Sequence, residues 1–239
     1  MKKLIIAILL VTVSPVLAQN FNSAANARAF ASDLFILDEY IKRQNKDVNF
    51  KDTKSYKGTP YNHPNFLSGN IYKEGSLLAE NIAIRYNAIA DEMEVKETIA
   101  SPEEDARVLT KSPDIYVKIL KDIYVFVPYQ GGIEEGGYFE VLQEGKTVAV
   151  YKKHIKDFTP SKKATSSLTK EVPANFKDKP IYYLVTKEGK FYQMPKSRSK
   201  KLKVFKEKQK DVKKYVKEKN LDLNKEEDLL KAVRFFDEQ

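Results

Sequence analysis

The chain has 239 residues and a formal net charge of +9, with 14 Tyr and 13 Phe but no Cys and no Trp. Without cysteine it cannot form disulfides, use a thiol nucleophile or bind a metal through thiolates, so a hydrophobic core must supply its stability. Its length suffices for one sizeable domain, or for one domain with an appendage.

The N-terminus is typical of a cleavable secretory signal peptide. Two lysines precede the apolar run Leu4–Val13, and Ser14 and Pro15 end this run before Ala18. The run is about half of the roughly 20 residues that a helix needs to cross a bilayer, which disfavours a membrane anchor. We therefore predict a signal peptide over residues 1–18, export to the periplasm or to the medium, and no transmembrane segment in the mature chain.

The next segment, residues 19–47, is predicted to be helical. Phe30, Leu34, Leu37 and Ile41 recur at spacings of four, three and four, which places them on one face of a helix. Such a face must pack on another part of the structure. The continuous apolar run inside this stripe also fits a short buried strand, so both interpretations stay open.

Residues 48–195 are predicted to form an antiparallel β domain. Apolar or alternating stretches separated by turn residues predict strands at 82–86, 115–119, 123–127, 138–142, 147–151, 181–186 and 190–194. Gly145 and Gly189 fall in the turns of two of the hairpins. The 123–127 stretch is apolar on both faces, as expected of a strand covered on both sides. The polar, proline-containing stretch 160–180 is expected to be a long loop.

The stretch RYNAIADEMEV, residues 85–95, raises the question of a catalytic carboxylate cluster. Met93 and Val95 alternate with Glu92 and Glu94, so a strand here would point the apolar pair at the core and the acids at water. Arg85 would lie on the same solvated side and pair across the hairpin with one glutamate. We expect such a surface pair to contribute less than about 1 kcal/mol, and we favour this interpretation over a catalytic one.

Other chemical motifs are weak. His63 and His154 lie far apart in the sequence, neither has a metal-ligand spacing, and we predict surface or turn positions for both. The glycine-rich stretch 131–137 lacks the lysine and hydroxyl of a phosphate-binding loop. We predict no cofactor, no metal and no enzymatic activity.

The C-terminal segment, residues 196–239, is predicted to be a basic helical hairpin. Residues 196–220 hold twelve Lys or Arg against three acids, a balance of +9, whereas residues 221–239 have a balance of −3. Asn224 and Glu227 have the spacing of a capping box at the start of the second helix. The two predicted apolar stripes are Leu202, Phe205, Val212 and Val216, followed by Leu229, Leu230, Val233 and Phe236.

The lysines of this segment are the candidate contact residues for a partner. The set consists of Lys200, Lys201, Lys203, Lys206, Lys210, Lys213, Lys214 and Lys217. An anionic lipid surface or an envelope protein would suit them, whereas nucleic acid is disfavoured because the chain is predicted to be exported, and we predict no nucleic-acid partner. The favoured interpretation is that the first helix packs its apolar stripe on the β domain and leaves its lysines in solvent.

Three stretches together carry a resemblance to a known group of proteins: KGTPYNHPNFLSGNIY, IRYNAIADEMEV and NLDLNKEEDLLKAVRFF. They resemble a group of uncharacterised exported proteins of Gram-negative bacteria. The resemblance implies a periplasmic or secreted β-rich protein, and it supplies no activity from which catalytic residues could be transferred.

The sequence thus predicts an α+β protein, mainly an antiparallel β meander with a curved sheet or partly closed barrel, an N-terminal helix and a C-terminal helical hairpin. The first functional hypothesis is an exported, non-enzymatic cell-envelope protein that binds a partner or has a structural role. The second is a β module that binds a small apolar or lipid ligand in a cavity lined by Tyr86, Tyr124, Phe126, Tyr138 and Phe139. The third and weakest is a hydrolase that uses paired carboxylates among Asp91, Glu92, Glu94, Glu134 and Glu135.

Overall fold

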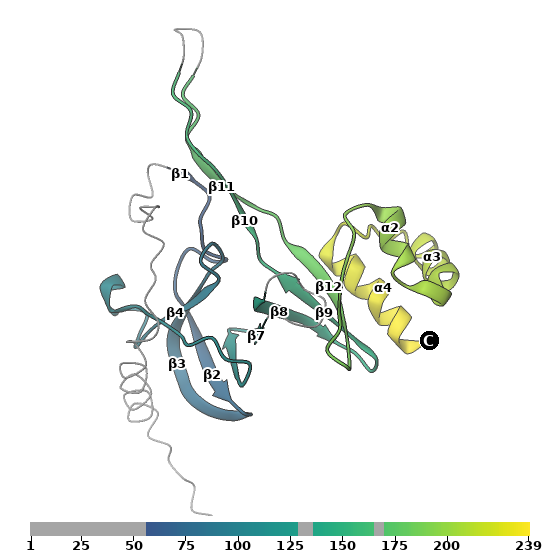
Figure 1. The fold of residues 1–239 in the computed structure, drawn as a ribbon, viewed down its shortest axis with the longest axis horizontal. Coiled ribbons are helices and arrows are strands. Elements are labelled where there is room, and N and C mark those ends of the chain that lie inside the picture. Colours follow the sequence, from purple (N-terminus) through teal and green to yellow (C-terminus); the bar gives the residue numbers. More distant parts are fainter. Residues whose placement is uncertain (1–55, 129–135, 165–169) are drawn as a thin grey trace, which may run out of the picture.

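The computed structural model describes residues 56–128, 136–164 and 170–239 (Figure 1). The predicted signal peptide, the predicted N-terminal helical segment 19–47, and both Glu134 and Glu135 lie outside the described residues.

A ten-stranded antiparallel sheet forms the body of the described molecule (Figure 1), in the order β13-β12-β9-β8-β7-β6-β2-β3-β4-β5. The bounds are β2 Leu67–Lys73, β3 Ser76–Asn87, β4 Glu92–Lys96, β5 Arg107–Val108, β6 Ile115–Ile119, β7 Asp122–Val127, β8 Gly137–Glu144, β9 Val148–Lys153, β12 Ile181–Thr186 and β13 Phe191–Gln193. All seven predicted strands are present, within one or two residues at most ends. The predicted antiparallel sheet is confirmed, but it does not close into a barrel, because β13 and β5 remain its two edges.

A second, three-stranded sheet extends away from this body (Figure 1). It contains β1 (Tyr56–Lys57), β11 (Ala174–Asp178) and β10 (Lys156–Thr159), with β1 parallel to β11. The prediction of a long loop over 160–180 was therefore wrong in its second half. Phe158 and Phe176 face each other across the two strands with ring centroids 4.8 Å apart, and this cross-strand aromatic pair favours pairing despite the polar, proline-containing surroundings.

Helices cover one part of the sheet. They are α2 (Arg198–Lys203), the 3-10 turn η2 (Lys206–Lys208), α3 (Gln209–Glu218) and α4 (Glu226–Glu238); another 3-10 turn, η1 (Glu103–Asp105), follows β4. The first predicted C-terminal helix is thus divided, because Lys206 has a positive φ of 47° that a continuous helix cannot contain. The predicted capping box is absent: Lys225 is the N-cap of α4 and makes no side-chain cap bond.

The structure has two large hydrophobic clusters, one among the strands from β2 to β8 and one between β9, β12 and the helices. The first includes Ile84, Tyr86, Met93, Tyr124 and Tyr138, which are at most 2% exposed. The second is shared by the sheet and the helices. Its members are Val150, Leu184, Met194, Leu202, Phe205, Val212, Val216, Leu221, Leu223, Leu229, Ala232 and Val233. The packing of the predicted stripe of the first helix on the β domain is therefore confirmed.

The expectation that β7 is covered on both faces was wrong. Tyr124 is buried, but its neighbour Ile123 is 36% exposed, and Val125 and Val127 are only half-buried. The helices pack over β9 and β12 on the face that Val150 and Leu184 share. No described element lies over the opposite face next to β7, and an apolar strand pattern cannot reveal that one of its faces lacks a cover.

Candidate functional site

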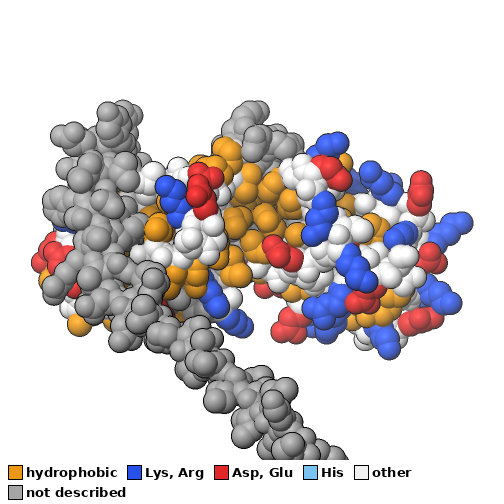
Figure 2. Space-filling model, turned by 90° about the horizontal axis from the view of Figure 1, so that it is seen from below, with side chains coloured by type: hydrophobic (Ala, Val, Ile, Leu, Met, Phe, Trp, Pro, Cys, Tyr) orange, Lys and Arg blue, Asp and Glu red, His pale blue; other side chains and the backbone are white. Residues whose placement is uncertain are grey.

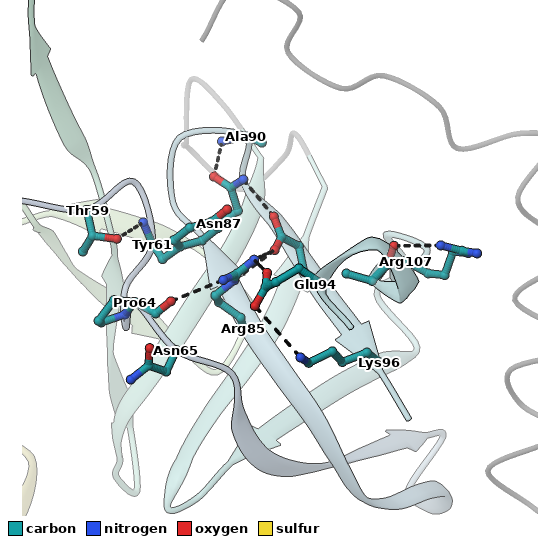
Figure 3. Close-up of polar contacts among 12 residues, drawn as sticks. Thr59, Tyr61, Pro64, Asn65, Arg85, Asn87, Ala90, Glu94, Lys96 and Arg107 are labelled. Atoms are coloured by element: carbon teal, nitrogen blue, oxygen red, sulfur yellow. Dashed lines mark hydrogen bonds and ion pairs between the residues drawn. The ribbon is translucent and has the colours of Figure 1, made fainter. Parts of the chain in front are cut away.

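Arg85 lies at the centre of a buried polar cluster (Figure 3). It is paired across the hairpin with Glu94, as predicted, and its Nε and Nη2 donate to Oε2 of Glu94 at 3.0 and 2.7 Å. Nη2 also donates to Glu103 at 3.0 Å, and Nη1 donates to the carbonyl oxygen of Pro64 at 3.3 Å. The other oxygen of Glu94 accepts a hydrogen bond from Asn87 at 3.1 Å.

Two aromatic rings enclose the guanidinium group of Arg85. Its Cζ lies 3.8 Å from the ring centre of Tyr61 and 4.1 Å from that of Phe66. Arg85 is 8% exposed, and the side chain of Glu94 is 15% exposed. Burial together with the charge of Glu94 raises the pKa of Tyr61 to about 12. The prediction of a solvated surface pair was therefore wrong: the loop that carries Tyr61 and Phe66 covers this face of the hairpin.

Asp91 occupies a different environment from Glu94. Its Oδ1 accepts the hydroxyl of Tyr86 at 2.6 Å and the backbone amide of Tyr138 at 3.1 Å, and its Oδ2 accepts Nζ of Lys153 at 3.0 Å. Asp91 thus joins the β3–β4 hairpin to β8 and β9. Gly137 makes room for this junction, because a Cβ there would lie 1.8 Å from Oδ2 of Asp91.

The described acids of the hairpin therefore do not form a catalytic pair. Asp91 and Glu94 each have their own cationic partner, Lys153 at 3.0 Å and Arg85 at 2.7 Å. Burial raises the pKa of Glu92, but the two neighbouring acids are already engaged by Lys153 and Arg85. This arrangement is a structural ion-pair network and gives the hydrolase hypothesis no support.

A second buried polar group surrounds His154. Nε2 of His154 lies 2.6 Å from Oε2 of Glu140, and both residues are less than 9% exposed. Nζ of Lys152 lies 3.6 Å from the same oxygen and 2.8 Å from Oε2 of Glu226 in α4. Burial would raise the pKa of Glu140, but the hydrogen bond from His154 and the charge of Lys152 outweigh it, so the pKa is lowered.

This group links β8, β9 and α4 and borders a polar hollow of about 250 Å³. The hollow is lined by Asn62, Lys152, His154, Ile155, Asp178, Pro180 and Tyr182. The predicted surface position is correct for His63, which is exposed, but wrong for His154. The predicted hairpin gave no signal for this: a turn at residues 144–145 would place Glu140 opposite Ala149, whereas the observed register, which is shifted by a bulge between Val141 and Gln143, places it opposite Lys152.

The aromatic side chains predicted to line a ligand cavity mostly fill the core. Tyr86, Tyr124, Tyr138 and Phe139 are at most 2% exposed and contact other rings, so they leave no space between them for a ligand. Phe126 differs, because it borders a surface groove of about 630 Å³. The groove lies over β7, β9, β12 and β13, where no cavity was predicted.

Seven of the eight candidate lysines are exposed. Lys214 forms an ion pair with Glu218 at 3.9 Å, and Nζ of Lys206 lies 5.5 Å from the ring centre of Tyr192. The other five exposed lysines form no ion pair with any described residue: Lys200, Lys203, Lys210, Lys213 and Lys217.

Lys201 is the exception among the eight. It is 7% exposed, and its Nζ donates to the carbonyl oxygen of Leu223 at 2.7 Å and to Oδ1 of Asn224 at 3.1 Å. Asn224, which was predicted to cap α4, therefore accepts a bond from this lysine instead. Lys201 holds the chain between α3 and α4 and is not part of the exposed basic surface.

Within the described ranges, no group of three or more His, Asp or Glu side chains is arranged to hold a metal ion. Nor is any helix there both long and apolar enough to span a membrane. Comparison with known proteins finds no matching family model, no similar curated protein and no similar solved structure.

Proposed function

We propose that this chain is an exported, non-enzymatic protein of the cell envelope that binds an anionic surface through the exposed lysines of α2 and α3. The supporting observation is the six exposed lysines of these two helices, five of which have no ion-pair partner among the described residues. Each lysine near an anionic membrane surface contributes about 1 kcal/mol at physiological ionic strength, so several together suffice for reversible binding.

The packing of the helices limits how they could bind a membrane. Leu202, Phe205, Val212 and Val216 are buried against the sheet and are at most 8% exposed. They are therefore unable to insert into a bilayer as the apolar face of an interfacial helix does. Binding through this surface is electrostatic and peripheral, and it weakens as salt screens the charges.

The same packing determines the choice of variant. Deletion of residues 196–239 would expose Val150, Leu184 and Met194 of the sheet, so loss of binding after deletion could result from misfolding. Charge-neutralising substitutions of exposed lysines avoid this problem. We choose the four lysines of α3, Lys210, Lys213, Lys214 and Lys217, each replaced by Gln.

The matched control replaces four exposed lysines in or next to β2 and β6, away from the helices, by Gln: Lys73, Lys111, Lys118 and Lys121. Both variants lose the same charge. Sedimentation with phosphatidylcholine vesicles, with and without phosphatidylglycerol, measures binding. We expect the native chain and the control variant to bind only the anionic vesicles and to dissociate at high salt, and the α3 variant to lose binding. Equal binding by both variants would refute the role of the helical lysines.

A further inference from the structure

One face of the sheet at its β7–β13 end carries a cluster of apolar side chains, three of them buried and the other five half-buried. We define this apolar face by Val125 and Val127 of β7, Phe139 of β8, Ala149 and Tyr151 of β9, Tyr183 and Val185 of β12, and Phe191 of β13. The strand register places them on one side: Val125 pairs with Phe139, Tyr151 with Tyr183, and Val185 with both Ala149 and Phe191.

Four aromatic rings of the apolar face pack against one another. Phe139 and Phe191 are 1% and 7% exposed and lie 5.3 Å apart, centroid to centroid. Tyr151 and Tyr183, each half-buried, lie 5.7 and 5.9 Å from the ring of Phe191. Seen from below, hydrophobic side chains gather on the surface between the β2–β4 end of the sheet and the helices (Figure 2).

A groove runs along this apolar face. It encloses about 630 Å³ and is bordered by Val127, Ala149, Tyr151, Val185 and Phe191, with charged residues at its rim, among them Glu144, Lys187 and Glu188. A contiguous apolar surface with a polar rim is typical of an interaction site, because leaving it in water is unfavourable.

The chain contains a segment whose pattern fits this groove. Residues 28–44 precede the first described residue, and Phe30, Leu34, Leu37 and Ile41 form one stripe at helical spacing. The other positions of this segment include both acids and bases, which suits a rim of mixed charge.

The connection between this segment and β1 consists of residues 45–55. Residues 45–55 span up to about 36 Å when extended, at about 3.3 Å per residue. A tethered segment also has a high effective concentration near its own sheet, of the order of mM for a short flexible linker, so it outcompetes free ligands of moderate affinity.

We propose that residues 28–44 dock on the apolar face as an amphipathic helix and fill the groove between β7 and β13. The stripe Phe30, Leu34, Leu37 and Ile41 then contacts Val127, Tyr151, Val185 and Phe191. This docking does not depend on the lysines of α2 and α3, so it can hold or fail independently of the proposed binding to an anionic surface.

Because the native chain has no cysteine, spin labels attach only at cysteines introduced by substitution, and the distance between two labels can be measured directly. In the full chain, Glu39→Cys is combined with Lys187→Cys at the rim of the groove, and the two thiols carry spin labels. The control pair combines Glu39→Cys with Lys73→Cys, an exposed position in β2. We expect a narrow, short distance for the first pair and a longer distance for the control pair.

Substitutions in the segment test the cause of this distance. Leu34→Glu with Leu37→Glu places charges in the stripe, whereas Ala29→Glu with Ser32→Glu adds the same charges outside it. We expect the first variant to lose the short distance and to bind more of a dye that recognises exposed apolar surface, and the second to behave like the native chain. The circular dichroism of the sheet reports whether each variant is folded.

Three outcomes would overturn the proposal. The first is a long distance between the labels at positions 39 and 187 together with dye binding that the Leu34 and Leu37 substitutions do not change. The second is a short distance that disappears on dilution, which would identify a second copy of the chain as the occupant. The third is a short distance that appears only when phospholipid is added.

Discussion

Replacement of Arg85 tests whether the ion pair on the β3–β4 hairpin is a buried structural element. In Arg85→Met the aliphatic part of the side chain is retained between Tyr61 and Phe66, while all four hydrogen bonds from the guanidinium group are lost. Glu94, with a side chain only 15% exposed, is left without its cation.

The expected cost separates this interpretation from a surface pair. Removing one partner of a buried ion pair costs about 3–5 kcal/mol, whereas an exposed pair contributes about 0–1 kcal/mol. Because Glu94 keeps the hydrogen bond from Asn87, we expect the lower end of the first range, about 3 kcal/mol, for Arg85→Met. Glu103→Gln is the control: the side chain of Glu103 is 64% exposed, and we expect a loss below about 1 kcal/mol.

Urea unfolding followed by circular dichroism gives the free energy of unfolding of each variant. A double-mutant cycle of Arg85→Met and Glu94→Gln then isolates the coupling between the two side chains, which we expect to exceed about 1.5 kcal/mol. A coupling below about 0.5 kcal/mol, with Arg85→Met no more destabilising than Glu103→Gln, would show that the pair behaves as the solvated contact that strand alternation predicts.

Three further predictions concern stability. Asp237 accepts hydrogen bonds from three backbone amides and one hydroxyl of the β8–β9 turn, and these bonds hold its pKa at about 2 against an ordinary value of 3.8. The stability that they contribute is therefore present above about pH 4 and is lost as the pH falls toward 2. Asp237→Asn should lower the free energy of unfolding by about 1 kcal/mol at neutral pH and flatten its dependence on pH between 4 and 2, and an unchanged pH dependence would contradict this assignment. Gly137→Ala should lower the free energy of unfolding in urea by at least about 3 kcal/mol, because φ of Gly137 is 129° and a Cβ would overlap Asp91 and Lys153. A variant as stable as the native chain would contradict the close approach of Asp91 and Lys153 to Gly137. Phe205→Ala, at a position 1% exposed, should cost about 3–5 kcal/mol and leave a single unfolding transition, whereas two separate transitions would mean that the helices and the sheet unfold independently.

The sequence by itself determined most of the strands and the direction of their apolar side chains. The alternation around Met93 and Val95 correctly places both residues in the core, and the turn glycines correctly place the hairpins at β8–β9 and β12–β13. These features are local: backbone geometry forces side chains of a strand to alternate between two faces, and a turn fixes the register of the two strands beside it.

Only the tertiary structure decided which faces are covered. Strand alternation assigns Arg85 and Glu94 to the side opposite the core, but the loop that carries Tyr61 and Phe66 covers this side, and Glu103 completes the cluster. Likewise, an apolar pattern on both faces of β7 does not reveal that the helices pack over a neighbouring part of the sheet.

The candidate sites follow the same rule. The exposed lysines of α3 could be predicted from the sequence because their stripe is helical and local, whereas the burial of Lys201 depends on the chain between α3 and α4, 22 residues further on. The pairing of Asp91 with Lys153 joins residues 62 positions apart. Local preferences decide how each segment is built, and the packing of distant segments decides which of its side chains are in contact with water.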